Sequence, residues 1–126
     1  MTNTEIMIDE SMQYPLNVSW LRGYNGLAKN VNATAIEKGW WDKDRNDAEC
    51  IALMHSELSE ALEGLREGNL PDDHIPEFTS VEAELADVII RIMDFGYAKK
   101  HRVAEAVLAK MRYNQARPRR HGGKAF

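Results

Sequence analysis

The 126-residue sequence has little cysteine, little proline and no long apolar run. Its single cysteine, Cys50, cannot form an internal disulfide, which excludes a small disulfide-stapled fold. No apolar stretch approaches the roughly 20 residues that a membrane helix needs, and no N-terminal stretch has the layout of a signal peptide. These absences predict a cytoplasmic protein that contacts no membrane, with Cys50 as a small residue in or near the core.

The sequence also lacks the alternation of apolar and polar residues that half-buried β-strands show. Apolar residues instead recur at helical spacing, which predicts an all-α protein. The expected helices cover residues 18–38, 48–67, 81–99 and 103–116. Short loops between long helices favour antiparallel neighbours, so we expect a four-helix-bundle-like protomer.

Signals at the ends of these segments support their boundaries. Asp47 is a suitable N-cap for the second helix, and Thr79 with Glu82 has the spacing of a capping box before the third. We expect one domain over residues 18–117, an N-terminal arm at 1–17 and a basic tail at 118–126.

Apolar residues occupy more than half of the circumference of the third expected helix. They are Val81, Leu85, Val88, Ile89, Ile92, Met93 and Phe95. In the second helix the expected inward stripe is Ile51, Met54, Leu58, Ala61 or Leu62, and Leu65. The third helix has more apolar surface than three neighbours of this size would cover, which predicts a homodimer or homotetramer formed through helices.

Charge is distributed unevenly along the chain. Residues 1–98 contain seven of the 16 Lys and Arg residues and 19 of the 20 Asp and Glu residues, for a net charge of −12. Residues 99–126 contain nine basic residues and one acid, for a net charge of +8. This division suits a site that binds a metal on one side and phosphates on the other, or a basic tail that docks on an acidic body.

Two pairs of carboxylates have i,i+3 spacing in the second and third helices. Glu57 and Glu60 form the first pair, and Glu84 and Asp87 form the second. Residues three apart share a helix face, so two facing helices would bring four acids together. Clustered carboxylates repel one another unless a cation is present, and an all-oxygen set suits Mg²⁺ or Mn²⁺. Glu57 also lies beside the apolar stripe and should be partly buried.

Two other interpretations of these acids remain open. Arg91 could pair with Asp87 or Asp94, which would make the acids partners in structural ion pairs. A di-iron helical bundle needs a Glu-x-x-His on each of two helices, and neither acid pair here has that form.

A second set of polar residues lies near the C-terminus. Lys110, Asn114 and Arg117 follow i, i+4, i+7 spacing, and Lys124 lies beyond them. Cations and an amide are suited to phosphate oxygens, although a solvated helix face has the same pattern. Trp40 and Trp41 could stack on a base or ribose, or one of them could anchor the core.

These motifs together resemble the MazG-like, all-α nucleoside triphosphate pyrophosphohydrolases, a superfamily that includes dimeric dUTPases and dCTP pyrophosphatases. The resemblance, which covers about residues 36–126, is to the short, single-domain subgroup. It is carried by Gly39-Trp40-Trp41, by Glu57-x-x-Glu60 and Glu84-x-x-Asp87 with 23 residues between them, and by Lys110-Met111-x-Tyr113-Asn114-x-x-Arg117-Pro118-x-x-His121-Gly122-Gly123-Lys124-x-Phe126.

The resemblance implies Mg²⁺ bound by Glu57, Glu60, Glu84 and Asp87, with Mn²⁺ as a possible substitute. It implies cleavage between the α- and β-phosphates of a nucleoside triphosphate, with Glu57 or Glu60 as the base that orients water. Substrate-binding roles would fall to Trp40, Trp41, Lys110, Asn114, Arg117 and Lys124. The alternatives are a catalytically silent nucleotide-binding protein and a helical oligomer that binds RNA or another protein, although nucleic acid is not the expected partner.

Overall fold

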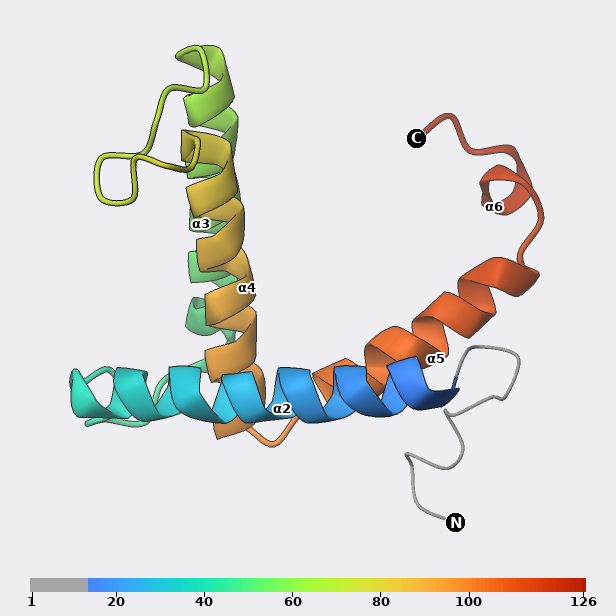
Figure 1. The fold of residues 1–126 in the computed structure, drawn as a ribbon, viewed down its shortest axis with the longest axis horizontal. Helices are drawn as coiled ribbons and strands as arrows, with labels where there is room; N and C mark the ends of the chain where they lie inside the picture. Colours follow the sequence, from blue (N-terminus) through green and yellow to red (C-terminus); the bar gives the residue numbers. More distant parts are fainter. Residues whose placement is uncertain (1–13) are drawn as a thin grey trace. The chain divides into compact units, whose positions relative to one another are not determined.

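The computed structural model describes residues 14–126, so residues 1–13 of the expected arm lie outside the described part. The described residues form five helices and no strand, which confirms the all-α prediction (Figure 1). The helices are α2 (Tyr14–Glu37), α3 (Asp47–Arg66), α4 (Ser80–Ala98), α5 (Val103–Ala116) and α6 (Arg120–Gly123). Within this range no helix combines the length and the apolar character that crossing a membrane requires.

Most helix boundaries agree with the local signals in the sequence. Thr79 and Glu82 form the predicted capping box, and α5 has the predicted bounds. The N-cap of α3 is Asn46 rather than Asp47, because the Asn46 side chain accepts hydrogen bonds from the N–H groups of Ala48 and Glu49. The side chain of Asp47 instead forms an ion pair with Lys99.

The first helix begins earlier than expected. Its predicted start is residue 18, whereas α2 begins at Tyr14, within the range 1–17 of the expected arm. A proline near the start of a helix is tolerated because the first N–H groups have no partner within the helix. Pro15 is therefore compatible with the first turn of α2. In the expected tail, α6 is a four-residue turn in which Arg120, His121 and both glycines have positive φ.

The chain forms two compact units whose boundary lies within α2. Among the described residues, one unit contains residues 14–27 together with His101–Phe126, and the other is Ala28–Lys100. A single domain over residues 18–117 stays a prediction. In the first unit, α2 and α5 pack around Leu21, Ala104 and Leu108. The indole N–H of Trp20 donates to the carbonyl of Ala104 at 3.1 Å, which also joins these two helices.

In the second unit, α3 and α4 pack along one another (Figure 1). The buried residues of α3 are Cys50, Glu57, Ala61 and Gly64, and those of α4 are Ala83, Met93, Asp94 and Gly96. The burial of Cys50 agrees with its predicted place in the core. Small side chains on both helices allow the two backbones to approach closely.

The predicted inward stripe of α3 is wrong for most of its members. Ile51, Leu58, Leu62 and Leu65 are between 42% and 56% exposed, while Cys50, Ala61 and Gly64 are buried. On α4, Leu85 and Ile89 are also exposed. The two helices meet through the small residues beside the large apolar stripe, so the stripe stays exposed among residues 14–126.

Candidate functional site

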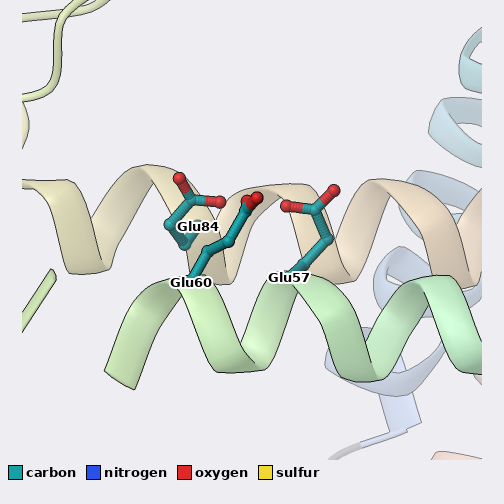
Figure 2. Close-up of side chains that lie close together, drawn as sticks. All are labelled: Glu57, Glu60 and Glu84. Atoms are coloured by element: carbon teal, nitrogen blue, oxygen red, sulfur yellow. The ribbon is translucent and has the colours of Figure 1, made fainter. Parts of the chain in front are cut away.

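Three of the four predicted metal ligands lie together on α3 and α4. One carboxylate oxygen from each of Glu57, Glu60 and Glu84 can be chosen so that all three lie within 4.8 Å of one another. Figure 2 shows Glu57 and Glu60 one turn apart on α3, with their carboxylates near that of Glu84 on α4. The i,i+3 spacing explains the first two positions, and the packing of α4 against α3 supplies the third.

The environment of Glu84 disfavours its charged form. Burial, followed by hydrogen bonds with Glu57 and Glu60 and the negative charges of these two acids, raises the pKa of Glu84 from 4.5 to about 7. One oxygen of this carboxylate, Oε2, is buried and has no hydrogen-bond partner. A buried polar atom without a partner is unusual in a folded protein and marks a place that a proton or a cation could occupy.

Glu57 is the most buried of the three acids, with a relative exposure of 9%, which confirms its predicted partial burial. Arg91 of α4 donates to one oxygen of Glu57, with Nε and Nη2 each 2.8 Å from Oε1. Burial acts to raise the pKa of Glu57, but hydrogen bonds from Arg91 and with Glu84 and Glu60 outweigh it and lower this pKa. Arg91 thus forms its ion pair with Glu57, and not with Asp87 or Asp94, the partners that the alternative interpretation named.

Asp87 does not join the group of three carboxylates among the described residues. Together with Glu57 it lines an adjacent cavity. Burial and then the charge of Glu57 raise the pKa of Asp87, while the Arg91 guanidinium opposes this change. Asp87 thus lies within the electrostatic field of the cluster, on the cavity side.

The cavity has a volume of about 320 Å³ and lies within the unit Ala28–Lys100. Its apolar wall comes from Val31, Ala35, Ile90 and Trp40, and its charged lining from Lys38, Arg45, Arg91, Glu57, Asp87 and Asp94. Ligand sites in proteins commonly combine an apolar wall with a few polar groups in this way. Of the three cluster acids, Glu57 is the one that lines the cavity, so a ligand there would be adjacent to the cluster through Glu57.

A buried network around Asp94 supports the cavity. Asp94 accepts hydrogen bonds from Asn32 Nδ2 at 2.8 Å and from Trp41 Nε1, and Arg45 approaches it at 3.7 Å. These contacts join α2, the loop after it, and α4. One indication of this network is present in the sequence, because Asp94 lies two helical turns after Asp87 and so near the same helix face. The partners of Asp94 could not be predicted, since Asn32 and Trp41 lie far from it along the chain.

The two tryptophans have different environments. The ring of Trp41 lies under Arg45 at 4.8 Å and near Lys99 at 5.8 Å, and its N–H is bonded to Asp94. Trp40 lines the cavity and is 64% exposed. Trp41 therefore has the environment of an anchor, whereas the ring of Trp40 is available to a ligand.

The predicted phosphate-binding residues of the C-terminal segment belong to the other unit. Lys110 and Arg117 lie against the ring of Tyr113, at 4.9 and 5.4 Å respectively. Asn114 and Lys124 are exposed. The spacing of Lys110, Asn114 and Arg117 thus places two cations at one aromatic side chain, which is a local arrangement within α5 and its end.

Searches with protein-family models, among curated proteins and among solved structures give no match to this chain.

Proposed function

We propose that this protein is a Mg²⁺-dependent nucleoside triphosphate pyrophosphohydrolase that releases a nucleoside monophosphate and pyrophosphate. The observation that carries the proposal is the carboxylate cluster of Glu57, Glu60 and Glu84, with its unpartnered Glu84 oxygen, beside a cavity. An oxygen-only ligand set suits Mg²⁺, with Mn²⁺ as a substitute. Asp87 is the fourth acid that would contribute to this site.

The residues fit a divalent cation on electrostatic grounds. A cation would keep Glu84 ionised despite its burial and would provide a partner for its Oε2 atom. When bound, Mg²⁺ would neutralise part of the phosphate charge and lower the pKa of a nearby water molecule. Glu57 or Glu60 would accept the proton of the attacking water, since both belong to the carboxylate cluster and Glu57 also lines the cavity.

The cavity supports the assignment of a nucleotide as substrate. Its volume of about 320 Å³ is at the lower end of the roughly 300–1,000 Å³ found for small-molecule sites. Trp40 would stack on the base, and Asp94 would hold Trp41 so that the loop after α2 keeps its shape. The resemblance also predicts that Lys110, Asn114, Arg117 and Lys124 bind the triphosphate and stabilise the departing pyrophosphate. This part of the proposal rests on the sequence motif, because these residues belong to the other unit.

The exposed apolar stripes of α3 and α4 support a homodimer or homotetramer. Leu58, Leu62 and Leu65 on α3 and Leu85 and Ile89 on α4 leave large apolar side chains accessible to water. Contiguous exposed apolar surface is typical of an interface between proteins. Pairing of two copies through these helices would cover it.

A panel of ribo- and deoxynucleoside triphosphates with Mg²⁺ tests the proposal. We expect release of pyrophosphate without orthophosphate as a first product, a preference for deoxynucleotides, and loss of turnover in excess EDTA. Glu57→Gln serves as the inactive control for contaminating phosphatases. Orthophosphate as first product, or turnover that survives EDTA, would contradict the proposal. Tight nucleotide binding without turnover would favour a catalytically silent protein.

A further inference from the structure

Arg91 contacts one carboxylate oxygen of the cluster through two of its nitrogen atoms. Its Nε and Nη2 atoms both lie 2.8 Å from the same Glu57 oxygen, Oε1. The Glu57 side chain is 11% exposed and that of Arg91 36% exposed, so solvent screens the pair only in part. Hydrogen bonds between two ionised groups at this distance are among the stronger ones in proteins.

The same carboxylate belongs to the group that could hold a metal ion. A divalent cation at the cluster would use Glu57, Glu60 and Glu84, and the Arg91 guanidinium already neutralises the first of these. Two positive charges that share one carboxylate repel each other. Arg91 and a divalent cation should therefore compete for Glu57.

The second feature is the position of Arg91 on the lining of the cavity. It lies one turn after Asp87 on α4 and lines the cavity with Asp87 and Glu57. A guanidinium released from Glu57 would remain beside the space where a ligand binds. Its planar donor groups match the geometry of phosphate oxygens.

We propose that Arg91 is an exchangeable counter-ion, which holds Glu57 in the metal-free protein and passes to a phosphate of the nucleotide when a divalent cation takes that carboxylate. This inference rests on the proposed function, because it assumes metal and nucleotide at the same site. Metal binding would then prepare the site for phosphate by releasing a cation already in place.

Lys38 provides a matched control, because it also lines the cavity but, within residues 14–126, forms no ion pair with the three carboxylates. Removal of either cation changes the net charge near the cavity equally. An effect of the Glu57 contact itself should therefore appear in Arg91→Gln and be much smaller in Lys38→Gln.

The first experiment measures Mn²⁺ binding to the metal-free protein without nucleotide, by electron paramagnetic resonance of the free ion. Arg91→Gln should tighten Mn²⁺ binding by about tenfold, since one charged hydrogen-bonded competitor is lost. Lys38→Gln should change it by less than about threefold. Arg91→Lys, which keeps the charge without the paired donors, should lie between these values. Equal effects of Arg91→Gln and Lys38→Gln, or weaker binding in Arg91→Gln, would overturn the inference.

The second experiment measures binding of an α,β-methylene nucleoside triphosphate at saturating Mn²⁺, with the corresponding nucleoside as the control ligand. Arg91→Gln should weaken binding of the triphosphate by about tenfold and leave that of the nucleoside unchanged. Unchanged triphosphate affinity would overturn the exchange. If the wild-type protein binds neither Mn²⁺ nor nucleotide, the proposed function fails and the inference fails with it. If the wild type binds both and Arg91→Gln alters neither, only the inference fails.

Discussion

The indole Nε1 of Trp41 donates to both carboxylate oxygens of Asp94, at 2.9 and 3.1 Å. This contact joins the loop after α2 to a residue of α4 that is itself 9% exposed. Asn32 of α2 donates to the same carboxylate at 2.8 Å. Asp94 of α4 is thus joined to α2 and to the loop after it, whose Asn32 and Trp41 side chains donate to its carboxylate. All three segments contribute to the lining of the cavity.

Trp41→Phe should destabilise the protein by about 1–2 kcal/mol, because it removes the donor to a buried carboxylate while keeping most of the ring. The measurement is urea unfolding followed by circular dichroism. Trp40→Phe is the control, since Trp40 is 64% exposed, and it should leave the free energy of unfolding almost unchanged. Equal effects of the two substitutions would show that the Asp94 contact contributes little.

Glu60→Gln and Asp87→Asn should each remove most of the proposed pyrophosphohydrolase activity while the protein stays folded. Loss of one negative charge from clustered acids relieves repulsion, so the melting temperature without metal should hold or rise. Glu63→Gln is a suitable control, because Glu63 is an exposed residue of α3 that pairs with Arg66. Unfolding of either active-site variant would instead identify these acids as structural ion-pair partners.

The stability of the metal-free protein should fall as the pH rises from 4.5 to about 7. In this range the unfolded chain has released the Glu84 proton, whereas the folded protein retains it because burial raises the pKa of Glu84 to about 7. The loss should be on the order of 1–2 kcal/mol after allowance for solvent screening. The pKa of Asp87 is also raised from its usual 3.8, so its loss of a proton lowers the stability of the folded protein too as the pH rises above that value.

Glu57 does not offset this loss in that pH range. Its pKa is lowered, so its stabilising contribution is complete above 4.5 and disappears only as the pH falls further. Thermal unfolding across the range should show a smaller decline in Glu84→Gln, and also with Mg²⁺ present. An identical decline in wild type and Glu84→Gln would contradict the role of Glu84.

Gly64→Ala should destabilise the protein by about 1–2 kcal/mol through crowding of the α3–α4 contact. A Cβ atom at Gly64 would lie 2.5 Å from the hydroxyl oxygen of Ser80 and 3.2 Å from its Cβ atom, so rotation of the hydroxyl alone would not relieve the contact. Gly23→Ala is the control, because beyond the local helix backbone no atom of the described residues would lie within 4 Å of the added Cβ, and alanine favours a helix by about 1 kcal/mol. The two substitutions should therefore shift the melting temperature in opposite directions.

Lys110→Ala should raise KM and lower kcat by about tenfold each if this residue binds the triphosphate and the departing pyrophosphate. Truncation after Pro118 should mainly raise KM, because the tail that contains Lys124 would act on bound substrate. Lys29→Ala, an exposed cation on α2, is the charge control. Unchanged kinetics together with a smaller oligomer mass would show that the basic segment serves assembly and would remove it from the site.

Local interactions explain what could be read directly from the sequence. The capping box of Thr79 and Glu82, the span of α5 and the one-turn spacing of Glu57 and Glu60 depend on residues close together in the chain. The i,i+3 spacing within each helix likewise allowed the four acids to be predicted as metal ligands. Three of them lie together in the structure, while their metal and their reaction stay predictions.

The sequence by itself determined that this protein is helical, where most helices begin and end, and which acids share a helix face. Tertiary structure decided which face of α3 meets α4, since Ala61 and Gly64 permit a closer approach than Leu58 and Leu62. It also decided that Arg91 pairs with Glu57, 34 residues away, and not with an acid on its own helix. Such choices depend on the rotation and separation of packed helices, which local spacing does not specify.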